Sequence, residues 1–364
     1  MISERTSLRE RLVAPLGGSK DWVDVAKGVA IIMVIFYHCS LFLSSANITV
    51  PGAFRLKAAL ELVPMPVFLA IAGIFHARVL QWSLKDTWRR RLLGYAYLYL
   101  LWCVLRFAFY LVVPNVRSDG AGAQASRPIF LALSPVWPTS SYWFIWALFL
   151  LTLVLWLVRR GRPWLVVTIA ALVSVASSSN LVVTGNVGWD RTAEYAVFFL
   201  AGAFYSKRLT QAVTAARPVV PLVSVALLLL VAGAGAFVPG ARGVPGLALV
   251  GQVAAIVATA TASKYVVRLR PLSWLSYLGA RSLPLYLIHV FVIAIIALGV
   301  SVAGLDRLSS ATTPFLLLAM VVIVVVASVL LGRVLARVRW LFTPPRFVNQ
   351  LVAGAPRAAV RTRG

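Results

Sequence analysis

The sequence predicts an all-α protein that crosses a membrane about ten times. Of its 364 residues, 61% are hydrophobic and only 12% are charged, and the mean hydropathy is +0.89. A water-soluble chain of this composition could not cover its apolar surface with polar groups. The apolar residues gather into runs of roughly 20 residues, the length that an α-helix needs to cross the hydrocarbon core of a bilayer.

Ten apolar runs are bounded by charged residues, prolines or glycines, and each predicts a helix. They cover residues 25–43, 62–80, 92–113, 142–158, 164–183, 193–205, 219–238, 244–263, 283–304 and 314–335. The polar segments between them are short, so one transmembrane domain is expected over residues 21–340. A polar cytoplasmic segment, 1–20, precedes it, and a basic cytoplasmic tail, 341–364, follows it.

Lysine and arginine predict the orientation, because they concentrate in the cytoplasmic segments of membrane proteins. With the N-terminus inside, 27 of the 35 lie in cytoplasmic segments, seven lie outside, and Arg106 lies within a span. Removing the short span 193–205 would reverse every later segment and place most later positive charges outside. Both termini are therefore expected in the cytoplasm. The net charge of +25 then reflects topology and contact with anionic lipid headgroups, and no nucleic-acid partner is expected.

The first span carries three polar side chains on one face. Asp24, Lys27 and His38 are separated by three and eleven residues, which places them within about 60° of one another on a helix. His38 lies roughly 16 Å from Lys27 along the helix axis, near the middle of the bilayer. An ionisable residue at that depth predicts a functional site. The alternative is a hydrogen bond that only joins two helices.

The other candidate residues lie near the two ends of the spans. His289 lies in the ninth run, whereas His76 is expected at the cytoplasmic interface without a special role. Carboxylates that could orient a histidine or a hydroxyl substrate are expected from the outer residues Glu61, Asp190 and Glu194. The alternative for these acids is a solvated helix end stabilised by the helix dipole.

Basic and aromatic residues suggest binding on the two faces. Before the third run, a dense cluster could hold a polyanionic cytosolic ligand, although topology alone also explains it. Its members are Lys85, Arg89, Arg90 and Arg91. On the outer side, Tyr142 and Trp143 could contact a carbohydrate or belong to the interfacial aromatic belt.

The first span resembles the opening signature of the membrane-bound acyltransferase-3 family. In "DVAKGVAIIMVIFYH", a basic residue, ten intervening residues and a histidine are met by Lys27 and His38. Lysine stands where many members have arginine, as in sugar O-acetylases related to fucose 4-O-acetylase. Three later stretches resemble the family in the expected order: "VPMPVFLAIAGIF", "SYWFIWALFL" and "SLPLYLIHVFVI". Two departures are that Val63 replaces a frequent histidine, and that "WRRRLL" lacks the arginine spacing of some O-antigen acetylases.

The resemblance implies a multi-pass enzyme of a bacterial-type cell membrane that is an O-acyltransferase. It would move an acyl group, usually acetyl, from cytosolic acetyl-CoA to a hydroxyl of a cell-envelope glycan or small exported acceptor, without a metal. His38 would act as general base or carry a transient acyl group, with Glu194 and His289 also catalytic. Lys27 and the cluster at Lys85 and Arg89–Arg91 would bind the donor. Glu61, Tyr142, Trp143 and Asp190 would contact the acceptor.

A function of another class is also compatible with the composition. A transporter or flippase for a glycan or lipid-linked sugar could use His38 as a proton relay. Few acidic residues lie within the spans, and no pair of half-helices is recognisable, which favours acyl transfer over transport.

Overall fold

The computed structural model describes residues 22–345 apart from 47, 114–124, 139 and 304–310. Over this part of the chain the regular elements are helices, without a strand, so the predicted all-α class is confirmed. Each of the ten predicted runs forms a helix. These are α2 (Trp22–Ser45), α4 (Pro64–His76), α6 (Leu93–Val112), α9 (Trp143–Val158), α10 (Pro163–Ser178), α11 (Val187–Phe204), α13 (Val219–Phe237), α14 (Leu247–Val266), α16 (Ser282–Val302) and α17 (Thr313–Leu335).

Shorter helices join these ten, and they include α3 (Ala53–Leu62), α5 (Leu84–Thr87), α8 (Pro128–Leu133), α12 (Ser206–Ala215) and α15 (Ser273–Ala280). Within the described residues, seven helical segments are long and apolar enough to cross a membrane, and the apolar helices α9 and α10 are shorter. The protein is therefore a polytopic membrane protein. The number of crossings and the cytoplasmic position of both termini stay predictions. The predicted segment 1–20 and most of the tail 341–364 lie outside the described residues.

Helix α11 begins earlier than predicted. The predicted start at residue 193 is wrong, because the helix begins at Val187 and is capped by the Asn186 side chain, which accepts a hydrogen bond from the Trp189 amide. The hydropathy pattern did not include the first residues of α11, because charged residues lie among them. Glu194 is nevertheless buried, since other helices of the protein surround this part of α11.

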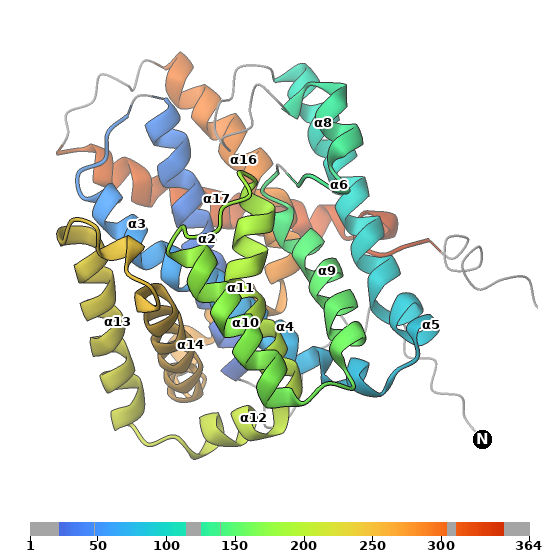
Figure 1. Ribbon diagram of the computed structural model, residues 1–364. Helices are drawn as coiled ribbons and strands as arrows, with labels where there is room; N and C mark the ends of the chain where they lie inside the picture. The colour runs from blue at the N-terminus through green and yellow to red at the C-terminus, as the bar shows by residue number, and fades with distance from the viewer. Residues whose placement is uncertain (1–21, 47, 114–124, 139, 304–310, 346–364) are drawn as a thin grey trace, which may run out of the picture.

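Helix α2 occupies the centre of the bundle and packs against α4, α14, α15, α16 and α17 (Figure 1). Its closest neighbour is α15. A Cβ atom at Gly28 would overlap the backbone carbonyl of Leu275, and one at Gly279 would overlap the carbonyl of Asp24. Only glycine permits this approach of the two backbones, a common device where membrane helices cross. The N-terminal end of α2 is thereby fixed against α15.

The remaining helices form two groups on either side of α2. Helix α11 packs against α4, α9 and α10, while α13 and α14 pair with each other at one edge of the bundle (Figure 1). Helix α13 is largely exposed, and its outward residues include Leu222, Leu229 and Leu230. Such a face is suited to lipid tails. Helix α12 crosses one end of the bundle, next to the start of α13 (Figure 1).

Candidate active site

Two histidines from helices far apart in the sequence meet inside the bundle. His38 of α2 and His289 of α16 have ring centroids 5.0 Å apart, and His289 Nε2 lies 3.4 Å from His38 Nδ1. His289 is fully buried, whereas His38 is half-buried. The structure therefore brings together two of the three predicted catalytic residues, which are separated by 251 positions.

The surrounding acceptors assign the tautomer of each ring. His289 Nδ1 lies 3.1 Å from the carbonyl oxygen of Leu285, which can only accept, so in the neutral ring Nδ1 carries the proton and Nε2 is an acceptor. His38 Nδ1 faces the Val34 carbonyl oxygen at 2.9 Å as well as His289 Nε2. Both of these partners accept, so His38 Nδ1 donates. His38 Nε2 is then the basic nitrogen of the pair.

Two tyrosines hold α16 against the start of α9 beside His289. The Tyr142 hydroxyl donates to the Leu287 carbonyl oxygen at 2.9 Å, and the Tyr286 hydroxyl donates to the Ser141 carbonyl oxygen. The Tyr286 ring also lies 5.9 Å from the His289 ring. Tyr142 was predicted to contact the acceptor. It is fully buried in this joint, so the structure gives it a contact that positions α16.

Lys27 lies on the same helix as His38, and its Nζ forms an ion pair with Asp24 Oδ1 at 2.7 Å. Both side chains are largely shielded from solvent, with exposed fractions of 22% and 16%. The predicted polar stripe on α2 is therefore present. The carboxylate offsets part of the positive charge that Lys27 offers to an anion.

The basic cluster before α6 does not point in one direction. Trp88–Leu92 forms a π-helical turn, which fans its three arginines around the axis. Arg90 lies over the Trp82 ring, and Arg91 donates to the carbonyl oxygen of Phe75 at 3.3 Å. Arg89 is half-buried, and Lys85 is exposed on α5. Binding of the donor by this cluster stays a prediction.

A second polar site surrounds Glu194 of α11. Glu194 is 5% exposed, and its two carboxylate oxygens accept hydrogen bonds from different residues. Arg191 Nη1 donates to Oε2 at 2.7 Å, and Gln252 Nε2 of α14 donates to Oε1 at 2.5 Å. Gln252 is itself 1% exposed, and its Oε1 atom has no hydrogen-bond partner. Glu194 is thus a buried carboxylate held by a cation and an amide.

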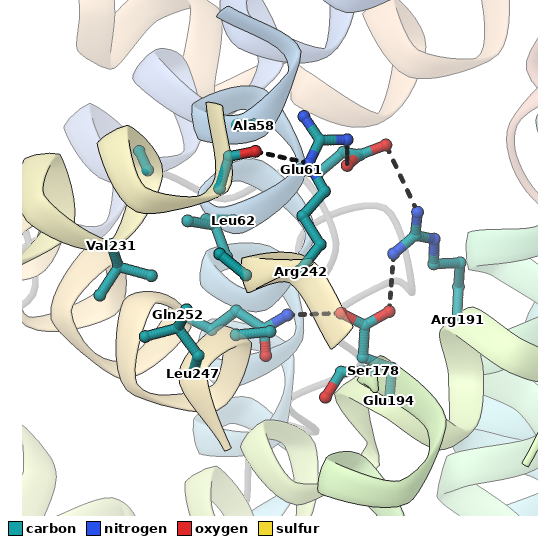
Figure 2. A pocket seen from close by; sticks show the side chains of 14 residues that line it. Ala58, Glu61, Leu62, Ser178, Arg191, Glu194, Val231, Arg242, Leu247 and Gln252 are labelled. Atoms are coloured by element: carbon teal, nitrogen blue, oxygen red, sulfur yellow. Dashed lines mark hydrogen bonds and ion pairs between the residues drawn. The ribbon is translucent and has the colours of Figure 1, made fainter. Parts of the chain in front are cut away.

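Glu61 of α3 extends this network toward the surface. It lies 3.6 Å from Arg191, 3.8 Å from Arg242 and 3.8 Å from Lys57. Arg242 belongs to the loop between α13 and α14, and its Nε donates to the Gly235 carbonyl oxygen at 3.0 Å. Figure 2 shows the carboxylates of Glu61 and Glu194 linked through Arg191, with Arg242 above and Gln252 below.

A cavity of about 90 Å³ lies within this network. We call it the outer pocket, because the predicted orientation places it on the non-cytoplasmic side. Its lining comes from α3, α10, α11, α13, α14 and the loop that carries Arg242 (Figure 2). The predicted residues Glu61 and Glu194 both line it.

Tyr37 interacts with His38 and with two residues of the outer pocket. It precedes His38 in α2, and the two rings lie 5.6 Å apart. On its other side, Tyr37 interacts electrostatically with Glu61 and Arg191. Tyr37 does not line the outer pocket, but Glu61 and Arg191, with which it interacts, both do.

The other predicted residues have local contacts. Asp190 accepts hydrogen bonds from the Thr184 amide and hydroxyl at 2.8 and 2.7 Å, which fixes the loop between α10 and α11. Trp143 is half-buried and lies 6.3 Å from the ring of Tyr195. His76 is buried at the end of α4, where its Nε2 accepts a hydrogen bond from the Tyr95 hydroxyl of α6 at 2.9 Å, and its position at the membrane interface stays a prediction.

The sequence interpretation missed Arg191, Arg242 and Gln252. A glutamine in the otherwise apolar run 244–263 is a signal that could have found Gln252, since an amide inside a membrane needs partners. The spacing of Arg191 and Glu194 by three residues predicts that they meet on one face of a helix. Arg242 lies in a loop, and its approach to Glu61 depends on the tertiary fold.

Comparison with known families decides the class of the protein. The model of the acyltransferase-3 family, described as an acyltransferase domain, matches residues 20–333. The chain belongs to the acyltransferase-3 family. This confirms the predicted family and an acyltransferase activity in a membrane protein. Comparisons with curated proteins and with solved structures gave no match.

The acyltransferase domain contains both polar sites. Lys27, the histidine pair and the residues that line the outer pocket all fall within the matched range. Two arrangements are thus available to this acyltransferase: an imidazole with a defined basic nitrogen, and a pocket lined by paired charges.

Proposed function

We propose that the protein is an O-acyltransferase in which His38 is the general base. The observation that supports this proposal is that the Val34 carbonyl oxygen and His289 Nε2 both face His38 Nδ1, because a proton on Nδ1 leaves Nε2 as the basic nitrogen. A neutral, half-buried imidazole with a fixed tautomer, packed among apolar helices, is suited to take a proton from a hydroxyl group.

The reaction that follows from this role is direct acyl transfer. His38 Nε2 accepts the proton of the acceptor hydroxyl while the hydroxyl oxygen attacks the thioester carbonyl of the acyl donor. The carbon–sulfur bond then breaks, and the proton passes from His38 to the departing thiolate. Ester and free thiol are the products. His289 acts as a positioning residue, since it contacts His38 and not the reacting atoms.

The proposed donor is acetyl-CoA in the cytosol, and the proposed acceptor is a hydroxyl of a cell-envelope glycan or exported molecule. Lys27 supports the donor side, because it lies on the polar stripe of α2 that leads from the predicted cytoplasmic edge to His38. The outer pocket supports the acceptor side. The proposed location is a bacterial-type cell membrane.

Membranes that contain the protein and radiolabelled acetyl-CoA provide the test. His38→Ala is expected to reduce acyl transfer to envelope material by about 100-fold or more, the usual effect of removing a general base. The variant should be present in the membrane at the wild-type level. Transfer at the wild-type rate by His38→Ala would contradict the proposal. Movement of a labelled glycan across the membrane without acyl transfer would instead favour a transporter.

A further inference from the structure

We infer that the outer pocket is the acceptor site and that it selects an uncharged ring bearing hydroxyl groups. This inference rests on the proposed function and adds to it the location, the size and the charge of the group that is acylated. Gln252 is the residue that we expect to determine its specificity.

The unpaired oxygen of Gln252 indicates a ligand with a hydrogen-bond donor. The amide orientation is fixed, because Nε2 donates to the Glu194 carboxylate and Oε1 therefore points elsewhere. Oε1 is buried and has no hydrogen-bond partner in the structure, although its residue lines the pocket (Figure 2). A buried acceptor without a partner is costly. A hydroxyl group supplies the missing donor, whereas a carboxylate or phosphate dianion cannot.

The charges of the lining favour a neutral ligand. The lining contains two carboxylates, Glu61 and Glu194, and two guanidinium groups, Arg191 and Arg242. The short contact between Arg191 and Glu194 already neutralises one pair. The separations of Glu61 from Arg191 and Arg242, 3.6 and 3.8 Å, exceed hydrogen-bond length. Hydroxyl groups, which both donate and accept, can bond to Glu61 and to these arginines without adding charge.

The volume of the pocket accommodates a single ring. A cavity of about 90 Å³ has room for roughly six to nine water molecules, which is the space that one sugar ring and its hydroxyls displace. Glu61 and Arg191, which line this space, interact electrostatically with Tyr37, the residue that precedes His38 in α2.

Two glycines of α13 allow a matched test in the full-length protein. A side chain at Gly235, which lines the pocket, meets its nearest neighbours, Arg242 and Ala58, only at ordinary contact distances. A side chain at Gly233 meets nothing within 4 Å, and Gly233 does not line the pocket. Gly235→Cys thus places a thiol inside the pocket, and Gly233→Cys places one outside the pocket on the same helix.

Both variants are treated from outside with a membrane-impermeant, sulfonate-bearing methanethiosulfonate, and acyl transfer to envelope material is measured. Modification of Gly235→Cys is expected to lower transfer at least about tenfold, with the KM for acetyl-CoA unchanged. Modified Gly233→Cys and the treated wild type, whose Cys39 and Cys103 are buried, should keep their activity. Full transfer by modified Gly235→Cys would overturn the assignment of the pocket.

The charge of the ligand is tested with two probes that differ by one carboxylate. Methyl glucopyranoside is expected to slow modification of Gly235→Cys at least about threefold more than methyl glucuronide at equal concentration. Equal protection, better protection by the glucuronide, or no protection by the glucoside would overturn the uncharged ring. His38→Ala separates the two proposals: if it abolishes transfer while the blocked pocket does not, only the pocket assignment fails.

Gln252→Met removes the unpaired oxygen and keeps the length of the side chain. It is expected to raise the KM for the acceptor about tenfold while the KM for acetyl-CoA stays the same. Gln211→Met, at an exposed glutamine on α12, is the control for the same substitution. An unchanged acceptor KM in a Gln252→Met protein of wild-type melting temperature would remove Gln252 from the proposed site.

Discussion

His289 Nε2 lies 3.4 Å from His38 Nδ1, and the two residues come from helices α16 and α2, far apart in the chain. This contact is long for a hydrogen bond, and His38 Nδ1 has a shorter one to the Val34 carbonyl oxygen at 2.9 Å. Two acceptors therefore face one donor. Each of the two acceptors favours the same tautomer of His38, so the effect of replacing His289 on the reaction rate is expected to be moderate.

We expect His289→Leu to lower kcat roughly five- to tenfold and to leave the KM for acetyl-CoA unchanged. Val34 still accepts from His38 Nδ1, so only one hydrogen bond, worth about 1 kcal/mol, is lost. His289→Gln retains an acceptor at the position of Nε2 and should recover most of the rate. Equal rates for the leucine and glutamine variants would show that His289 contributes only packing.

Lys27→Ala is expected to raise the KM for acetyl-CoA about tenfold and to change the KM of the acceptor little. The physical reason is that Lys27 shares a face of α2 with His38, while its partner Asp24 neutralises only part of its charge. Initial rates at varied donor concentration provide the measurement. Lys207→Ala is the control, because Lys207 is exposed on α12 and belongs to neither proposed binding site. If both variants have the wild-type KM for acetyl-CoA, Lys27 contributes only to the orientation of the protein in the membrane.

Gly28→Ala should destabilise the protein by about 2 kcal/mol or more. A methyl group at this position overlaps the backbone carbonyl of Leu275, which cannot rotate away as a side chain could. Thermal unfolding in detergent measures the effect. Gly299→Ala is the matched control within another membrane helix, since a side chain there meets nothing within 4 Å. Similar melting temperatures for the two variants would contradict the close crossing of α2 and α15.

Tyr95→Phe is expected to lower stability by about 1–3 kcal/mol without changing transfer per folded molecule. The substitution leaves the buried Nε2 of His76 without the hydroxyl that now bonds it at 2.9 Å. Tyr205→Phe is the control, because the Tyr205 hydroxyl has no hydrogen-bond partner among the described residues. A loss of transfer larger than the loss of folded Tyr95→Phe protein would give His76 a part in the reaction.

The helices were predictable because each apolar run has the length and the boundaries of a membrane helix. The start of α11 was not, since Asp190, Arg191 and Glu194 interrupt its apolar pattern, and their partners come from other helices. A hydropathy pattern records the average environment of a segment. It does not record that Gln252 of α14 and Glu61 of α3 converge on the same turn of α11.

In the candidate site, too, some features could be predicted from the sequence and others could not. His38 and Lys27 could be placed from their spacing on a single helix. The contact of His38 with His289 could not, because it depends on how α16 is rotated against α2. The basic cluster shows the converse: Arg89, Arg90 and Arg91 are consecutive in the sequence, and the π-helical turn directs them to different neighbours.

The reciprocal bonds of Tyr142 and Tyr286 limit how the enzyme can move. The Tyr142 hydroxyl bonds to a main-chain oxygen of α16, and the Tyr286 hydroxyl bonds to a main-chain oxygen of the turn before α9, so sliding α9 along α16 would break both bonds at once. His289 therefore lies in a rigid part of the bundle, where α16 is joined to the start of α9. Among the described residues, helix α13 is not joined to this part by such hydrogen bonds, and it packs mainly on α14 and α3. Any motion that admits an acceptor is therefore expected on the α13 side of the bundle, while the orientation of His38 stays unchanged.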